Sequence, residues 1–261
     1  MPPGSPDVTS SFSNITNQNQ SFNANMEKGY KHLAYFFGVI ALITFVGFYK
    51  RYFALFPDFE GLKYLHHFHA LALTTWLTML IVQPILAAKN NMKAHALIGK
   101  FSYFLVPFIF VSMILAYHHQ YLRMVGEGKP ETETLAFVFS PATDAIPFVL
   151  FYLLAILHKR ETPKHMRYMI STGIVIGGPG LGRIFMTWLG MDILAAIGLM
   201  SLITLLVFVG FILYDKVKKK PFRWNPFTMA FIIWLIPNIL IIFFPNTALW
   251  LGIAKWMVTT F

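Results

Sequence analysis

Five histidines stand at the ends of two neighbouring apolar segments of the sequence. His66, His67 and His69 precede one segment, and His118 and His119 close the next one. Imidazole nitrogens are good ligands for Zn, Cu and Fe, and they also bind haem iron. His66 and His69 are three residues apart, which places both on one face of a helix. This pattern predicts a transition-metal or haem site, with His69 and His118 as the first candidates for ligands.

Two opposite charges lie within apolar segments further along the chain. Asp144 follows a Ser-Pro-Ala-Thr sequence, and Arg183 ends the glycine-rich run that starts at Gly177. A charge that faces lipid costs at least about 2.5 kcal/mol, so each needs a partner or water. We expect Asp144 and Arg183 to form a salt bridge or to share a water-filled pocket. Such a pair either fixes the register of two helices or, if it opens, handles a proton or solute.

The glycine-rich run itself has two interpretations. It has no Gly-Lys-Ser/Thr sequence and no preceding strand, so it does not fit a phosphate-binding loop. Small residues in an apolar helix more often allow a second helix to approach closely. The run therefore predicts close helix packing, with a kink at Pro179.

Other polar side chains extend the list of candidates. His95, His158 and His165 form a second histidine set near other segment ends. In addition, His69, Trp76 and Gln83 recur every seven residues, close to two helical turns, so they form one stripe on a helix. A buried Gln83 needs a hydrogen-bond partner. The stripe either joins two helices by hydrogen bonds or lines a path for a substrate.

Composition decides which elements must position these side chains. Hydrophobic residues make up 56% of the 261 residues and charged residues only 12%, against about 25% charged in soluble domains. A water-soluble fold of this size cannot bury so much apolar surface, which excludes a soluble enzyme, a nucleic-acid-binding module and a disordered chain. The absence of cysteine excludes disulfides, thiolate metal sites and cysteine nucleophiles.

The apolar residues form seven stretches, each about long enough to cross the hydrocarbon core of a bilayer. We therefore predict an all-α, polytopic membrane bundle of about seven helices, which occupies residues 30–245. Residues 1–29 are polar and predict a disordered tail, and residues 246–261 predict a segment that lies at the membrane surface. The stretches lie near 32–49, 68–88, 98–118, 135–157, 167–189, 193–214 and 226–245.

The distribution of positive charge predicts the orientation. The net charge is +10, and most of the 21 lysines and arginines lie in the loops on the side of the N-terminus. The positive-inside rule then places the N-terminus in the cytoplasm and the C-terminus outside, in a plasma (inner) membrane. Asp144 and Arg183 fall in the outer half, and His95, His158 and His165 fall inside. The histidines on the outer side are His66, His67, His69, His118 and His119. Basic loops of this kind encode topology and do not indicate nucleic acid.

The same residues resemble those of a group of bacterial multi-pass membrane proteins. In that group a His precedes a span with Trp and Gln, the next span starts with a His-Arg-x-x-Gly pattern, and a later one starts with His-x-Arg-x-Met and ends in Arg. The matching segments here are His69 with Trp76 and Gln83, His95-Ala96-Leu97-Ile98-Gly99, and His165-Met166-Arg167-Tyr168-Met169 with Arg183. Ala96 replaces the usual Arg. The resemblance covers about residues 64–185 and implies a membrane bundle without implying an activity.

Three functions fit these observations. The first is binding of a transition metal (Zn, Cu or Fe) or haem near the outer face, for electron transfer or for assembly of a respiratory complex. There His66, His67 and His119 are alternative ligands, and Asp144 and Arg183 support the site. The second is transport of a small solute or proton along Asp144, Arg183 and Gln83. The third is a non-catalytic subunit of a membrane complex, or a homo-oligomer, in which the histidines only mark the lipid–water boundary.

Overall fold

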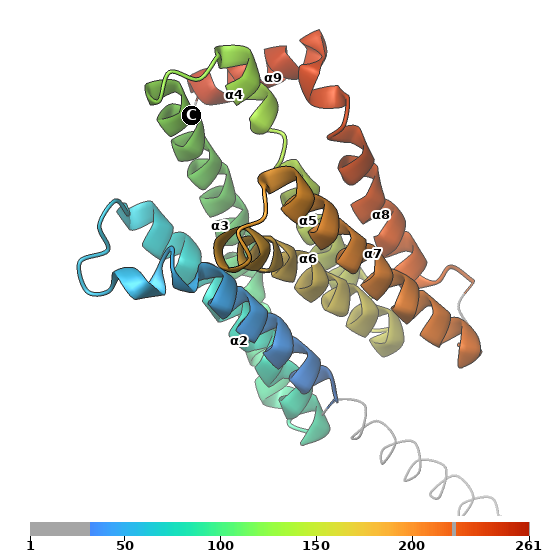
Figure 1. Cartoon of the computed structure of the whole chain (residues 1–261). Helices are drawn as coiled ribbons and strands as arrows, with labels where there is room; N and C mark the ends of the chain where they lie inside the picture. Colours follow the sequence, from blue (N-terminus) through green and yellow to red (C-terminus); the bar gives the residue numbers. More distant parts are fainter. Residues whose placement is uncertain (1–31, 221–222, 261) are drawn as a thin grey trace, which may run out of the picture.

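The computed structural model describes residues 32–220 and 223–260, and within them it contains helices and no strand. The first helix is His32–Tyr49. The remaining elements follow in the order η1 Phe53–Leu55, α2 Tyr64–Ala88, α3 Met92–Gly126, α4 Glu131–Phe137, α5 Ala142–Leu157, α6 Thr162–Trp188, α7 Ile193–Val217, α8 Pro226–Leu240, η2 Phe244–Asn246 and α9 Ala248–Thr260. Figure 1 shows the long helices running side by side in one bundle. The predicted all-α fold is confirmed.

Six segments in the described part of the chain are long and apolar enough to cross a membrane. They are the first helix, α2, α3, α6, α7 and the stretch Glu131–Leu157, which contains both α4 and α5. The seventh predicted span corresponds to α8, which has only 15 residues. At about 1.5 Å per residue it falls short of a hydrocarbon core of about 30 Å. The six candidate spans make this a multi-pass protein, whereas the predicted total of seven spans and the predicted orientation stay predictions.

The predicted span 135–157 is two helices. α4 ends at Phe137 and α5 begins at Ala142, and Pro141 stands at the start of α5. Proline fits the first turn of a helix but has no N–H to continue one. Beyond the break, α4 packs against α9, where the Trp250 indole donates to the Leu135 carbonyl at 3.0 Å. Figure 1 shows α4 and α9 together near the C-terminal end of α3.

Helix α6 is the centre of the bundle. Of an apolar 18-residue stretch of α6, 61% is buried inside the protein, against 17% for the corresponding stretch of α7. It packs mainly on α5 and α7, and it also contacts α8 and α2. The large side chains that fill the core around it include Trp76, Phe148, Phe151 and Phe208, each at most 1% exposed. Polar side chains on α2, α3, α5 and α6 are therefore held by well-packed helices.

The glycine-rich run of α6 packs against the first helix. Gly47 and Gly180 lie so close that a Cβ added at Gly47 would stand 2.1 Å from the Gly180 carbonyl oxygen. A Cβ at Gly173 would meet the Phe37 ring at 2.7 Å, and one at Gly177 would meet Ile40 at 3.1 Å. The predicted role in close helix packing is thus confirmed, and α6 continues as one helix through Pro179.

Candidate functional site

Four side chains from four helices meet near one end of the bundle. His69 lies near the start of α2, Tyr117 lies in the last third of α3, Asp144 in the first turn of α5 and Arg183 near the end of α6. Alternate helices run in opposite directions, so these positions share one end, which the positive-inside rule assigns to the outside. Arg183 interacts electrostatically with His69, Tyr117 and Asp144. We call these four residues the outer centre.

The predicted salt bridge between Asp144 and Arg183 is not formed. The Arg183 guanidinium lies over the Phe48 ring, 4.2 Å from its centroid, and its Nη1 donates to the Pro179 carbonyl at 3.1 Å. These contacts hold Arg183 away from direct contact with the carboxylate. The Asp144 carboxylate makes no hydrogen bond or ion pair with any described residue, although its backbone N–H donates to the Pro141 carbonyl at 3.1 Å. The outer centre therefore holds an acidic and a basic side chain that interact electrostatically without direct contact.

The hydrogen bonds around His69 favour one tautomer of its imidazole ring. Its Nδ1 lies 2.9 Å from the Ser112 hydroxyl oxygen. That hydroxyl already donates to the Ile109 carbonyl at 2.7 Å, so its oxygen must accept the hydrogen from Nδ1. Neutral imidazole carries one hydrogen, which leaves Nε2 with a free lone pair. His69 can thus take up a proton or bind a metal at Nε2.

The five outer histidines do not converge on one point. Consecutive residues of a helix are turned by about 100°, so neighbouring side chains point in different directions. His67 bonds to the Tyr52 hydroxyl at 2.8 Å, whereas the ring of His66 meets the ring of His119 with centroids 5.0 Å apart. Among residues 32–220 and 223–260 there is no group of three or more His, Asp or Glu side chains that could hold a metal ion.

His69 and His118, the first candidates for ligands, stand at different levels. His69 is bonded to Ser112, and His118 lies six residues further along α3, about 9 Å along the axis. The Nδ1 of His118 is buried and has no hydrogen-bond partner. Their role as a pair of ligands for one cofactor therefore stays a prediction.

The inner histidines bind the backbone. His165 Nδ1 donates to the Ala155 carbonyl at 2.8 Å, and His158 Nδ1 donates to the Leu154 carbonyl at 2.8 Å. Gln83 donates through Nε2 to the carbonyl of His95 at 3.1 Å, which joins α2 to α3. His95 also interacts electrostatically with His165. The three histidines thus lie at one end of the bundle, where the bonds of His95 and His165 join neighbouring helices and that of His158 stays at the end of α5.

The stripe His69, Trp76 and Gln83 faces the interior of the bundle. Trp76 is 1% exposed, and its ring makes edge contacts with Phe148 at 5.5 Å and Tyr152 at 5.7 Å. Two polar atoms of the stripe, Trp76 Nε1 and Gln83 Oε1, are buried without a hydrogen-bond partner. Buried polar groups usually bond to protein or water. Both atoms therefore mark places where water or a ligand is expected.

One buried ion pair was missed by the sequence reasoning. Arg167 donates from Nε and Nη2 to the two carboxylate oxygens of Asp215, at 2.7 and 2.5 Å, and the side chains are 5% and 1% exposed. Asn225, which caps α8, donates to the same carboxylate at 3.0 Å. The network joins α6, α7 and α8 at the inner end. The signal available in the sequence was Asp215, a lone acidic residue directly before the basic cluster that starts at Lys216.

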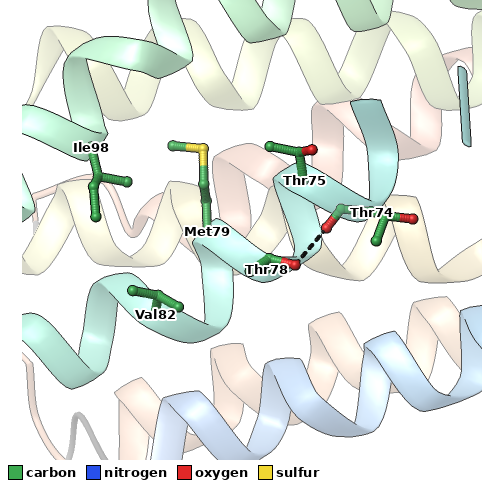
Figure 2. Close-up of a pocket in the computed structure, with 6 residues that line it drawn as sticks. All are labelled: Thr74, Thr75, Thr78, Met79, Val82 and Ile98. Carbon is green, nitrogen blue, oxygen red and sulfur yellow. Dashed lines mark hydrogen bonds between the residues drawn. The ribbon is translucent and has the colours of Figure 1, made fainter. Parts of the chain in front are cut away.

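Two hollows in the described part of the chain lie on outward-facing helix surfaces. One has a volume of about 240 Å³ and is lined by Thr74, Thr75, Thr78, Met79, Val82 and Ile98 (Figure 2). There the Thr78 hydroxyl donates to the Thr74 carbonyl at 2.8 Å, which satisfies it without a ligand. The other lies on α9, between Ala248 and Trp256. Neither hollow includes a residue of the outer centre.

Comparison with protein-family models, with curated proteins and with solved structures finds no match for this chain. The resemblance to bacterial multi-pass membrane proteins therefore stays a prediction. The function has to be inferred from the outer centre and from the polar contacts of the bundle.

Proposed function

We propose that this chain is a multi-pass protein of the plasma membrane that relays a small charged species through the outer centre. Intramembrane ionisable residues are rare because they are costly, and they commonly mark pathways for ions or protons. Asp144, Arg183 and His69 come from three different helices and interact at one end of the bundle. The lipid bilayer is the partner that the apolar helices require.

The observation that carries the proposal is the open state of the Asp144–Arg183 pair. The same molecule contains a pair that only joins helices, and in it Arg167 and Asp215 make two direct hydrogen bonds. Asp144 and Arg183 interact electrostatically but make no such bond. An open pair leaves the carboxylate able to exchange a cation or proton, and the guanidinium able to hold an anion.

Charge movement across proteoliposomes tests this proposal. Purified wild-type protein should carry more current than protein-free liposomes when a pH or ion gradient is applied. Asp144→Asn should lower that current by about tenfold, which corresponds to about 1.4 kcal/mol in the barrier. Asp58→Asn is the matched control, because Asp58 is an exposed carboxylate in the loop before α2. A wild-type current equal to that of empty liposomes, or a normal current in Asp144→Asn, would contradict the proposal.

One contact favours metal binding as a second candidate. The imidazoles of His66 and His119 touch, and His69 offers a free Nε2 nearby on the same helix. A transition metal (Zn, Cu or Fe) or haem bound there would serve electron transfer or assembly of a respiratory complex. Metal sites usually need three or four ligands, so water or a partner subunit would have to complete this one.

Metal analysis and an absorbance spectrum of the purified protein test the second candidate. Bound metal or a Soret band that disappears in His69→Ala or His118→Ala would support it. Their absence from wild-type protein would reject it. If stoichiometric membrane subunits co-purify and neither current nor metal is found, the third function, that of a non-catalytic subunit, is favoured.

A further inference from the structure

We infer that the relayed species is the proton, and that it crosses the bundle along a hydrated row of polar groups on the interior face of α2. The row starts at His69 and Ser112, passes Trp76 and the Tyr152–Ser102 pair, and ends at Gln83, His95 and His165. This inference rests on the proposed function, and it adds the identity of the species and the route beyond the outer centre. We call these residues the α2 row.

The first step belongs to His69. A proton that binds its free Nε2 allows Nδ1 to release its own proton toward the Ser112 oxygen, 2.9 Å away. To pass the proton on, the Ser112 hydroxyl breaks its hydrogen bond to the Ile109 carbonyl and releases its own hydrogen toward water, so each group gains one proton and loses one. Arg183 opposes a positive charge on His69, and Asp144 offsets Arg183, because all three interact electrostatically. The Asp144–Arg183 pair thus sets the electrostatic potential at His69, where the proton enters the α2 row.

The middle of the α2 row is the unpartnered indole of Trp76. Its Nε1–H is buried and has no acceptor in the protein. Leaving such a donor unsatisfied costs about 1–3 kcal/mol, so an internal water is the expected acceptor. The Trp76 ring touches Tyr152, whose hydroxyl lies 2.8 Å from the Ser102 hydroxyl. Two hydroxyls and an indole therefore lie together between the ends of the row.

The inner end is formed by Gln83 and two histidines. Gln83 Oε1 is a buried acceptor without a donor, and Gln83 Nε2 donates to the backbone carbonyl of His95. His95 interacts with His165 at the start of α6. His69 and Gln83 are 14 residues apart on α2, or about 21 Å. That is most of a hydrocarbon core of about 30 Å.

The separation of the polar groups favours the proton over a solute. The two hollows described above lie on the outward-facing surface, and neither includes a residue of the α2 row. The polar atoms of the α2 row stand in separate groups within a close-packed interior. A proton needs only water and hydroxyl groups between them, and single buried waters fit such sites.

Proton flux into proteoliposomes tests the route. Vesicles with an internal pH dye are given a potassium diffusion potential, and the rate of internal pH change is measured. Trp76→Phe keeps the ring but removes the N–H, and Gln83→Met keeps the volume but removes the amide. Each should lower the rate by about tenfold. Trp234→Phe and Asn238→Leu are matched controls in α8, since both residues lie outside the row.

The possible results separate the inference from the proposed function. A wild-type current without a pH change would show another ion, which overturns the inference and leaves the proposed function standing. Normal proton flux in Trp76→Phe and Gln83→Met would overturn the route alone. A wild-type protein without any current would overturn both.

Hydrogen exchange of the indole groups gives a second test that needs no flux and no stable variant protein. In D₂O the Trp76 Nε1–H should exchange faster than that of Trp250, although only 1% of Trp76 is exposed. The Trp250 Nε1–H donates to the Leu135 carbonyl and should be protected. Nuclear magnetic resonance of indole-labelled wild-type protein measures both rates. A Trp76 signal that outlasts that of Trp250 would show a dry interior and overturn the inference.

Discussion

At the scale of single residues, the two intramembrane charge pairs differ in how they are satisfied. Arg167 and Asp215 meet in two direct hydrogen bonds, and Asn225 adds a third bond to the carboxylate. Arg183 is held by the Phe48 ring and the Pro179 carbonyl, whereas the Asp144 carboxylate makes no hydrogen bond to a described neighbour. The first arrangement is typical of a structural contact. The second leaves both side chains available for exchange.

Substitution of the two aspartates should therefore have opposite consequences. Asp215→Leu removes the carboxylate that accepts two hydrogen bonds from Arg167, and breaking a buried pair costs about 3–5 kcal/mol. We expect a large fall in the thermal stability of the detergent-solubilised protein. Asp144→Asn removes a carboxylate without a bonded partner and should leave stability nearly unchanged. Equal stability losses in the two variants would contradict this distinction.

Acid should weaken the contact at the start of α6. Lys164 bonds to Glu161 at 2.7 Å, and this contact lowers the pKa of Glu161 below its ordinary value. A group whose pKa is lower in the folded state stabilises the fold at neutral pH, and this contribution is lost as pH falls through the folded pKa. Glu161→Gln should therefore be slightly less stable than wild type at pH 7 and equal to it at pH 3. Melting curves at both pH values check this, and a difference that grows in acid would contradict it.

Sequence reasoning selected candidate residues from their types and spacing, but it could not give the directions of their side chains. The period of seven placed His69, Trp76 and Gln83 on one face, and all three face the interior. The charges of Asp144 and Arg183 stood out against their apolar surroundings. Side-chain contacts decided the rest, because Phe48 holds Arg183 and Ser112 holds His69. These contacts join residues far apart in the chain and leave no local pattern.

At the scale of the elements, the crossing of the first helix and α6 depends on two glycines. A methyl group at Gly47 would overlap the Gly180 backbone, whereas one at Gly38 would meet nothing within 4 Å. Gly47→Ala should therefore destabilise the protein by about 1–3 kcal/mol or more. Gly38→Ala on the same helix should be neutral or slightly stabilising. Thermal unfolding of both variants checks this, and equal melting temperatures would mean that the crossing adapts.

The break between α4 and α5 was visible in the sequence only in part. Pro141 marks a helix start, but the apolar run continues through it, so one span was predicted. The separation of α4 becomes clear only from its packing partners, since Leu135 and Phe139 form a small core with Trp250. That core joins segments more than 100 residues apart. Apolarity alone cannot predict such a pairing, because lipid and protein neighbours require the same side chains.

At the scale of the whole molecule, orientation is the property that most affects the proposed route. The positive-inside rule places the loop after α3 outside and the loop after α7 inside. The chain has no cysteine, so a single introduced thiol reports its own side of the membrane. Glu127→Cys should react with a membrane-impermeant maleimide on intact cells, and Lys218→Cys only after lysis. Both positions are exposed in the structure. The reverse labelling would invert the orientation and exchange the two ends of the α2 row.

The length of α3 has a practical consequence for imaging. With 35 residues it is about 52 Å long, so it extends well beyond a hydrocarbon core of about 30 Å. Its far end at Gly126 is helical up to the loop, and that end also contacts α4. A rigid helical fusion partner joined in phase with this end would add a fixed mass outside the detergent micelle. Such a fiducial would let single particles of this small protein be aligned by electron cryomicroscopy.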